Sequence, residues 1–292
     1  MGGAVLLSRS PARTGMSRLS LIEFTSAVGD VDANIDRALH MIDRAAKEGA
    51  DLVVLPELWN TGYLAGRLVA HLAEPLSGRT ISALADAATQ HRLWILAGSI
   101  AESHGRRPCN TSVLLDDRGR VRLVHRKVHL WTAYERRWFA AGTGFRTAQT
   151  PWGRVGIMVC YDGDFPEVPR LLALRNATIL LHPSAYPARH RSDWETLYPA
   201  WARANSVFVV GINHVGREKG TYARHHWPRG VAFHGESQVL GPKGEIIYRA
   251  RSDVAAVHTV NVNFRMSAPL RAGRSSAMRD RRPKEYRGLA RE

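Results

Sequence analysis

The sequence has few cysteines and no long apolar run. Its 292 residues contain two cysteines, Cys109 and Cys160, which are too few for a disulfide framework, so we expect a reducing, cytoplasmic setting. No apolar stretch approaches the roughly 18 residues that a membrane-spanning helix needs. Near the N-terminus the arginines follow a short apolar patch, which reverses the order found in a signal peptide. The sequence therefore predicts no membrane span, and it predicts a disordered leader over residues 1–16.

Acidic residues are scarce beside basic ones, 26 against 41, and the net charge is +15. Of this excess, +3 lies in residues 1–18 and +6 in residues 265–292, so more than half of it sits in two tails. No zinc-finger spacing or RNA-binding aromatic motif accompanies the charge, and the thirteen histidines show no metal-ligand spacing. His225 and His226 are adjacent, so on a strand they would face opposite ways. We therefore expect no metal site, and we favour a solvated or dimer-clasping tail over a nucleic-acid-binding surface.

The remaining chain reads as one α/β domain over residues 17–264. Its first elements are a strand over 19–24, a helix that Asp30 or Asp32 caps and that runs to Glu48, and a strand over 52–55, which predicts a parallel pair with a right-handed crossover. Hydrophobic patterning predicts further strands over 94–100, 111–115, 121–125, 155–159, 178–181, 207–212, 237–240, 246–248 and 255–262. It predicts further helices over 77–91 and 193–205, and one that begins near Pro166 with Asp164 as its N-cap. Irregular segments are expected over 56–66, 127–145 and 215–229.

Three of these strands are followed by reactive side chains. Cys160 ends the run 155–159, and Glu57 and Lys127 each stand two residues beyond another strand. Each has an ordinary explanation, because free cysteine packs as a small hydrophobe and a loop Glu or Lys is usually solvated. If the strands are neighbours, however, the groups converge, and active sites of α/β sheets collect at such strand ends. A carboxylate can then take the thiol proton while an ammonium balances a developing oxyanion, and a helix N-terminus would lower the thiol pKa. Cys109 precedes a strand and is expected to pack.

The segments around these residues resemble the nitrilase, or carbon–nitrogen hydrolase, superfamily, whose catalytic triad is Glu, Lys and Cys. The matching runs are GADLVVLPELWNTGY (49–63), HRKVHLW (125–131) and VGIMVCYDGDFPEVPR (155–170), with accessory runs CNTSVLLDDRG (109–119), ERRWFAAGTGF (135–145), HPSAYP (182–187) and FHGESQVLGPKGEII (233–247). The resemblance implies a four-layer α-β-β-α sandwich of two stacked mixed sheets with helices outside. It also implies a homodimer or higher homo-oligomer in which the basic tail, residues 265–292, reaches across the partner subunit.

The resemblance also implies a mechanism that needs no metal or organic cofactor. Cys160 is the expected nucleophile and Glu57 the general base. The Lys127 ammonium and the backbone N–H of Tyr161 are the expected oxyanion donors. Glu135 matches a second glutamate that positions substrate and hydrogen-bonds the lysine. Asp162, Pro166, Glu167 and Arg170 match the family pattern and are expected to brace the cysteine loop.

The substrate is expected to be a small primary amide, with an N-carbamoyl amine or amino acid as the alternative. Nitrilases usually carry Trp-Glu after the nucleophile, whereas this chain has Tyr161-Asp162-Gly163, so a nitrile ranks lower. The loop lacks the Arg pair with which some carbamoylases hold a substrate carboxylate, although Arg189 or Arg191 could substitute, and Asp164 could favour a cationic substrate. The candidate pocket residues are Tyr63, Trp131, Tyr134, Trp138, Asp164, Tyr186 and Trp194. A basic nucleic-acid-binding protein with a degenerate hydrolase fold is the alternative from another class.

Overall fold

Two stacked β-sheets form the centre of the molecule. We analyse a computed structural model that describes residues 16–220, 227–251, 253–273 and 276–290. The first sheet has the strand order β15-β1-β2-β3-β5-β4, with β6 also paired to β5. Its strands are β1 (Ser17–Glu23), β2 (Leu52–Val54), β3 (Trp94–Leu96), β4 (Ile100–Glu102), β5 (Cys109–Leu115), β6 (Val121–Arg126) and β15 (Ala256–Val262). Because β1, β2 and β3 run parallel while β5, β6 and β15 pair antiparallel, the sheet is mixed.

The second sheet has the order β14-β13-β10-β9-β8-β7. Its strands are β7 (Thr147–Thr150), β8 (Gly153–Ile157), β9 (Ile179–Pro183), β10 (Phe208–Ile212), β13 (Gln238–Leu240) and β14 (Ile246–Arg249). A separate ribbon pairs β11 (Val215–Glu218) with β12 (Val231–His234). Here β8, β9 and β10 run parallel, so the second sheet is also mixed.

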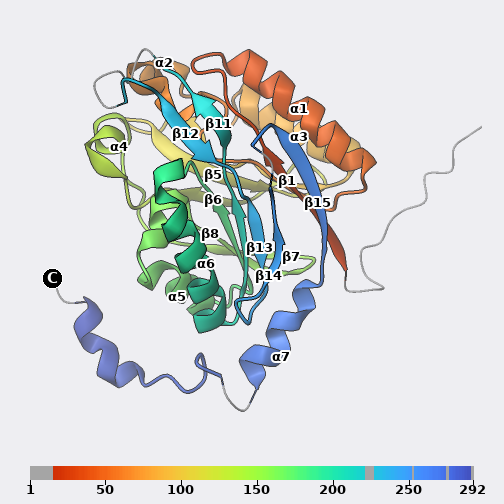
Figure 1. The fold of residues 1–292 in the computed structure, drawn as a ribbon, viewed down its shortest axis with the longest axis vertical. Helices are drawn as coiled ribbons and strands as arrows, with labels where there is room; N and C mark the ends of the chain where they lie inside the picture. Colours follow the sequence, from red (N-terminus) through yellow and green to blue (C-terminus); the bar gives the residue numbers. More distant parts are fainter. Residues whose placement is uncertain (1–15, 221–226, 252, 274–275, 291–292) are drawn as a thin grey trace, which may run out of the picture.

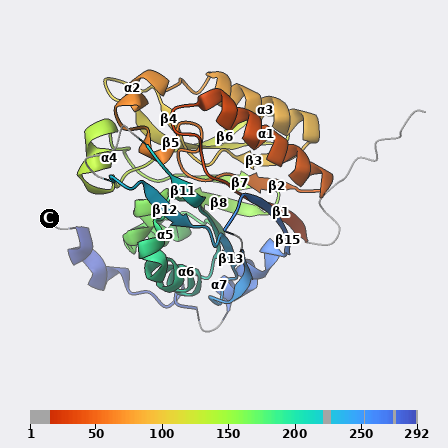
Figure 2. The same ribbon diagram turned by 45° about the horizontal axis from the view of Figure 1, so that its top comes forward.

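Helices cover the outer face of each sheet, and Figure 2 shows the four layers. Helices α1 (Val31–Lys47) and α3 (Arg79–His91) cover the first sheet, and α5 (Glu167–Leu174) and α6 (Arg191–Asn205) cover the second. Strand residues alternate between two cores: Leu52 and Val54 of β2 join the core between the sheets, while Val53 packs under α1 and α3. The predicted four-layer α-β-β-α sandwich is therefore confirmed.

Several predicted local elements are wrong. The run 94–100 is two strands, β3 and β4, because Gly98 turns the chain with φ +61° so close to Pro56 that a Cβ would lie 1.9 Å from its carbonyl oxygen. The segment 127–145 contains the helix α4 (Thr132–Trp138), and 215–229 contains β11. Asp164 is not the N-cap of α5, since Pro166 holds that position and the Asp164 carboxylate accepts from Tyr186 instead. His225 and His226 lie outside the described residues, as do residues 1–15 of the expected leader.

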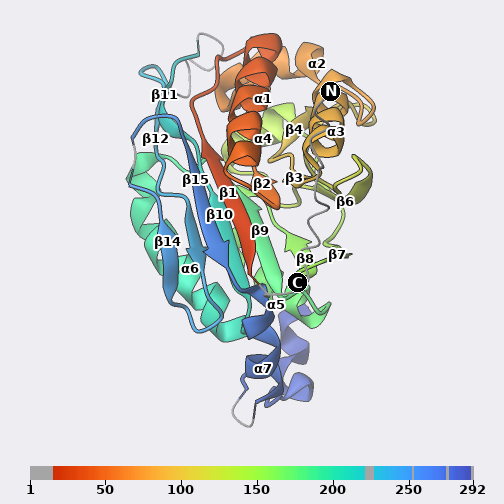
Figure 3. The ribbon, with the colours of Figure 1, turned by 90° about the vertical axis from the view of Figure 1, so that its right-hand side faces the viewer.

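Short helical segments complete the chain. They are η1 (Tyr63–Leu68), α2 (Val69–Leu72), η2 (Cys160–Asp164), η3 (Ala188–His190), η5 (Phe264–Met266), α7 (Ser267–Ala272) and η6 (Pro283–Ala290). The C-terminal tail begins by packing on its own subunit, because the Arg271 guanidinium donates to the carbonyl oxygens of Ala173 (2.5 Å) and Ala177 (2.7 Å). Residues 282–289 are exposed, and Figures 1 and 3 show α7 and η6 beyond the ends of the sheets. None of the helices in the described ranges is both long and apolar enough to cross a membrane.

Candidate active site

Glu57 follows β2 and is fully buried. One carboxylate oxygen, Oε1, accepts from Lys127 Nζ at 2.8 Å and from Asn110 Nδ2 at 2.8 Å. The other oxygen, Oε2, has no hydrogen-bond partner among the described residues. Two donors therefore fix the orientation of the carboxylate through one oxygen and leave the second available as a base.

Lys127 follows β6 and is also fully buried. Its ammonium lies between Glu57 Oε1 and Glu135 Oε1, at 2.8 Å from each. Burial alone would lower the pKa of Lys127, but the charges of Glu135 and Glu57 outweigh that effect and raise the pKa well above its usual value. The site thus holds a fully buried cation.

Glu135 lies on α4 and is the third member of this buried cluster. Its Oε1 accepts from Lys127 and from the Tyr63 hydroxyl at 3.1 Å, and its Oε2 accepts from the backbone N–H of Trp131 at 2.7 Å. Burial raises the pKa of Glu135 to about 7, with the charge of Glu57 adding to the rise and Lys127 opposing it. Two carboxylates and one ammonium therefore share one buried site.

Cys160 begins η2 in a strained conformation, with φ +44°, which costs a non-glycine residue about 1–3 kcal/mol. Its carbonyl oxygen accepts from His182 Nε2 at 2.8 Å, and the other ring nitrogen of His182 lies 2.5 Å from the Tyr198 hydroxyl. Burial lowers the pKa of His182 to about 4, so the ring is neutral and donates through Nε2. The surrounding aromatic core thereby holds the backbone of the cysteine in its turn.

The thiol of Cys160 differs from the expectation drawn from a helix N-terminus. Burial and the negative charge of Glu57 raise its pKa well above the usual value, while Lys127 and a hydrogen bond from the backbone N–H of Ala185 lower it by less. The expected lowering of the thiol pKa is therefore wrong, because burial and the charge of Glu57 outweigh the lowering by Lys127 and the N–H of Ala185. The thiol remains protonated until a base takes its proton, and Glu57 is the adjacent base.

Asp162 joins the cysteine turn to the lysine segment. Its Oδ2 accepts from His125 Nε2 (2.8 Å) and the backbone N–H of Val159 (3.0 Å), and its Oδ1 accepts from the ring (2.9 Å) and backbone N–H (2.9 Å) of His129. Despite full burial, these donors hold the pKa of Asp162 far below its usual value. The carboxylate therefore joins the segment around Cys160 to the segment that holds Lys127, as its expected bracing position requires.

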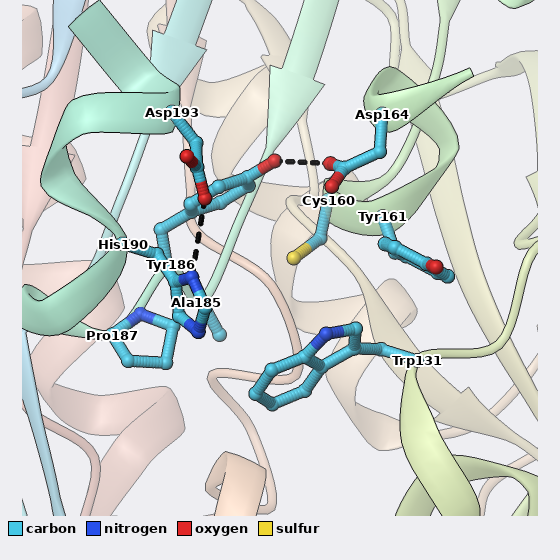
Figure 4. Close-up of a pocket in the computed structure, with 9 residues that line it drawn as sticks. All are labelled: Trp131, Cys160, Tyr161, Asp164, Ala185, Tyr186, Pro187, His190 and Asp193. Atoms are coloured by element: carbon cyan, nitrogen blue, oxygen red, sulfur yellow. Dashed lines mark hydrogen bonds and ion pairs between the residues drawn. The ribbon is translucent and has the colours of Figure 1, made fainter.

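A cavity of about 90 Å³ opens beside Cys160, and Figure 4 shows the sulfur pointing into it. Its lining residues are Trp131, Cys160, Tyr161, Asp164, Ala185, Tyr186, Pro187, His190 and Asp193. Three of the seven candidate pocket residues, Trp131, Asp164 and Tyr186, therefore line it. A space of this size suits part of a small molecule.

The other four candidates do not line this cavity. Tyr63 is buried behind it, where its hydroxyl donates to Glu135, and Tyr134 is buried beside Tyr63. Trp194 packs in the core with its indole N–H on the carbonyl of Glu236, and Trp138 lies at the end of α4 under Arg137. These aromatic side chains pack in or around the core, because their elements turn them away from the space above the thiol.

The two arginines considered as carboxylate-binding groups also lie outside the cavity lining. Arg189 stands over the Trp131 ring, with its guanidinium carbon 5.8 Å from the ring centroid, and Arg191 forms a 2.7 Å ion pair with Glu236. The lining thus contains the carboxylates of Asp164 and Asp193 and, within the described part of the chain, no lysine or arginine.

Sequence reasoning assigned no role to four residues that shape this site: Asn110, His182, Ala185 and Asp193. Asn110 lies in the run CNTS, and His182 and Ala185 lie in HPSAYP, so two accessory motifs already contained three of them. Their contacts depend on strands brought together from distant parts of the chain, which a single sequence does not reveal. For Asn110, the available signal was an Asn directly before the predicted apolar strand 111–115.

Comparisons with known proteins agree with this geometry. The family model described as carbon-nitrogen hydrolase matches residues 18–272. An (R)-stereoselective amidase from a Pseudomonas species is 32% identical over 236 residues, 81% of each chain. A crystal structure of a carbon-nitrogen hydrolase from Helicobacter pylori G27 superposes with a TM-score of 0.86 at 26% identity, covering 95% of this chain and 99% of that one.

A second solved structure bears on the cysteine. It is a mutant of the amidase from Nesterenkonia sp. AN1, with a TM-score of 0.82 at 25% identity, covering 94% of this chain and 98% of that one. It shows covalent addition of the acetamide moiety of fluoroacetamide at the active-site cysteine of that protein.

Proposed function

The chain belongs to the carbon–nitrogen hydrolase family, and on that premise we propose that it is an amidase that converts a small primary amide into a carboxylic acid and ammonia. Cys160 is the nucleophile and Glu57 the general base. The observation that carries this proposal is the asymmetric Glu57 carboxylate. Lys127 and Asn110 hold one oxygen, while the other is buried without a partner in the same site as a protonated thiol.

Acylation begins when Glu57 Oε2 takes the proton of the Cys160 thiol. The sulfur attacks the amide carbon, and the carbonyl π-electrons move to oxygen. The Lys127 ammonium and the backbone N–H of Tyr161 stabilise this oxyanion, and losing one such donor typically costs about 10²–10³ in rate. Glu57 then returns the proton to the nitrogen, the C–N bond breaks, and ammonia leaves a thioester on Cys160.

Deacylation repeats the sequence with water. Glu57 takes a proton from a water molecule as its oxygen attacks the thioester carbon. When the tetrahedral intermediate collapses, the C–S bond breaks and the proton passes to the sulfur, so the acid leaves and the thiol is restored. Glu135 fixes Lys127 throughout by accepting a 2.8 Å hydrogen bond from its ammonium.

Substitution of the nucleophile tests the proposal. Cys160→Ala should abolish ammonia release while leaving the thermal unfolding curve nearly unchanged, because a buried thiol is replaced by a small apolar group. Mass spectrometry of the parent enzyme mixed rapidly with an amide should show an acyl adduct on Cys160. A screen of primary amides, ureido acids and nitriles identifies the class, since carbon dioxide release marks a carbamoyl substrate. Retained turnover in Cys160→Ala would overturn the mechanism.

We also propose that the enzyme is a homodimer whose tail contacts the partner subunit. The support is the family resemblance together with the exposure of residues 282–289, in which Tyr286 and Leu289 present apolar side chains to solvent. Removing residues 282–292 should shift the mass measured by light scattering toward the monomer. An unchanged dimer would show that the tail is not needed for association.

A further inference from the structure

The cavity beside Cys160 has one acidic side, which we call the acidic wall: Asp164, Tyr186 and Asp193. Asp164 comes from the end of η2, Tyr186 from the loop after β9 and Asp193 from the first turn of α6. Figure 4 shows the two carboxylates on one side of the cavity, with Tyr186 between them and the Trp131 ring opposite. The nucleophile, only 7% exposed, points into the space that they enclose.

Neither carboxylate of this wall forms an ion pair with lysine or arginine among the described residues. Asp164 accepts a 2.5 Å hydrogen bond from the Tyr186 hydroxyl, and no ion pair joins it to lysine or arginine within the described residues. Asp193 lies 3.1 Å from His190 Nδ1. His190 Nε2 in turn accepts from Arg189 Nε at 3.1 Å.

The two carboxylates also act on each other. Partial burial raises the pKa of Asp164 and the negative charge of Asp193 adds to the rise, while the Tyr186 hydrogen bond and the charge of Lys127 oppose it by less. Like charges that face a shared space destabilise the empty site, and a cation placed between them relieves the repulsion. Trp131 closes the opposite side with its aromatic ring, over which the Arg189 guanidinium already stands.

The charge of the whole chain has the opposite sign, +15, and this contrast excludes long-range steering as the origin of any selection for cations. At physiological ionic strength the Debye length is about 8 Å, so exposed charges farther than this from the cavity are largely screened from a ligand inside it. Discrimination must then come from groups that contact the ligand. We propose that the acidic wall selects an amide whose acyl chain carries an ammonium group, in preference to a neutral or carboxylate-bearing amide.

This inference rests on the proposed amidase function, because the wall is assigned to the acyl chain of a substrate whose carbonyl lies at Cys160. The ammonium would sit between Asp164 and Asp193, with the amide toward Lys127. A charge-assisted hydrogen bond contributes about 1.5–3 kcal/mol, which corresponds to roughly ten-fold or more in kcat/KM.

Matched amides test the proposal. Ammonia release is measured for 4-aminobutanamide, pentanamide and glutaramate, which carry an ammonium, a methyl and a carboxylate at the chain end, and for the shorter set 3-aminopropanamide, butanamide and succinamate. We expect kcat/KM for the ammonium member to exceed that of the methyl member by about ten-fold or more, with the carboxylate member slowest.

Variants then locate the selectivity. Asp164→Asn should reduce the ammonium-to-methyl ratio by about ten-fold, and Asp164→Lys should invert the order in favour of the carboxylate member. Because each ratio is measured on one enzyme preparation, partial unfolding does not affect it. The matched control is Asp36→Asn, which removes the same charge from the exposed face of α1 and should leave the ratio unchanged.

Three results separate the two proposals. If none of the six amides releases ammonia, the amidase function fails. If the neutral or the carboxylate members react as fast as the ammonium member, the amidase function stands and the inference fails; a faster carboxylate member would instead assign Arg189 as the binding group. If Asp36→Asn changes the ratio as much as Asp164→Asn, the net charge selects the substrate and the inference is also overturned.

Discussion

The four residues that we propose for catalysis, Glu57, Lys127, Glu135 and Cys160, are here called the catalytic cluster. The cluster and the acidic wall differ in how their charges are paired. In the cluster every member is buried, and Lys127 is held at 2.8 Å by two carboxylates. In the wall the carboxylates reach solvent, and neither pairs with lysine or arginine within the described residues. The first arrangement preorganises charges for a chemical step, and the second leaves charge available for a ligand. On the proposed function, the fixed charges of the cluster serve the reaction, and the accessible carboxylates of the wall select the substrate.

The largest expected effect comes from breaking the buried ion pairs. Lys127→Met retains the length of the side chain but leaves Glu57 and Glu135 without their cation, so the free energy of unfolding should fall by about 3–5 kcal/mol. Loss of the oxyanion donor should also lower kcat by about 10²–10³. Urea unfolding and ammonia release measure the two effects.

The matched control for this variant is Lys243→Met, at an exposed turn between β13 and β14, which should change neither quantity appreciably. A Lys127→Met enzyme as stable as its parent would mean that the two carboxylates do not depend on the lysine.

An effect of intermediate size is expected on the pH dependence of the free energy of unfolding, through His182 behind the catalytic cluster. His182 has its pKa lowered from 6.5 to about 4 by burial, so as the pH falls through this window the unfolded chain binds the proton first. The free energy of unfolding should therefore decrease from pH 6.5 to about 4, with His182 contributing up to about 1.4 kcal/mol per pH unit.

His182→Gln tests this assignment, because glutamine does not titrate and can still donate to the Cys160 carbonyl. Urea unfolding at several pH values should show a shallower decrease for the variant than for the parent. Equal slopes would assign the acid sensitivity to other groups, such as His234, whose pKa burial also lowers to about 4.

The smallest effect is expected at the outer end of the acidic wall. Asp193 keeps 46% of its side chain exposed and already accepts from His190, so Asp193→Asn should change stability by less than about 0.5 kcal/mol. The ammonium-to-methyl ratio should fall a few-fold, less than in Asp164→Asn. A larger loss from Asp193→Asn would make it the principal contact of the cation.

The sequence predicted helices and strands correctly where the segment itself contains the hydrophobic periodicity and the capping residue. Asp30 caps α1 by accepting from Ala33, as its position before an amphipathic run indicates. The sequence predictions failed where a distant segment decides the conformation. Gly98 splits a predicted strand because Pro56 lies against it. Asp164 does not cap α5, because its carboxylate accepts a hydrogen bond from Tyr186 instead. The candidate pocket residues Tyr134 and Trp194 are buried in the core, because segments distant in the sequence pack around them.

The sequence by itself determined which reactive groups follow the strands, since Glu57, Lys127 and Cys160 stand at ends that hydrophobic patterning marks. It also determined the family, through three ordered motifs. Only the tertiary structure decided what each group does there. Burial raises the pKa of the Cys160 thiol, which a helix N-terminus would lower. Lys127 and Asn110 both donate to Oε1 of Glu57, so Oε2 is the oxygen without a partner among the described residues. The acidic wall joins residues from separate segments, because charge and solvent exclusion depend on neighbours in space rather than along the chain.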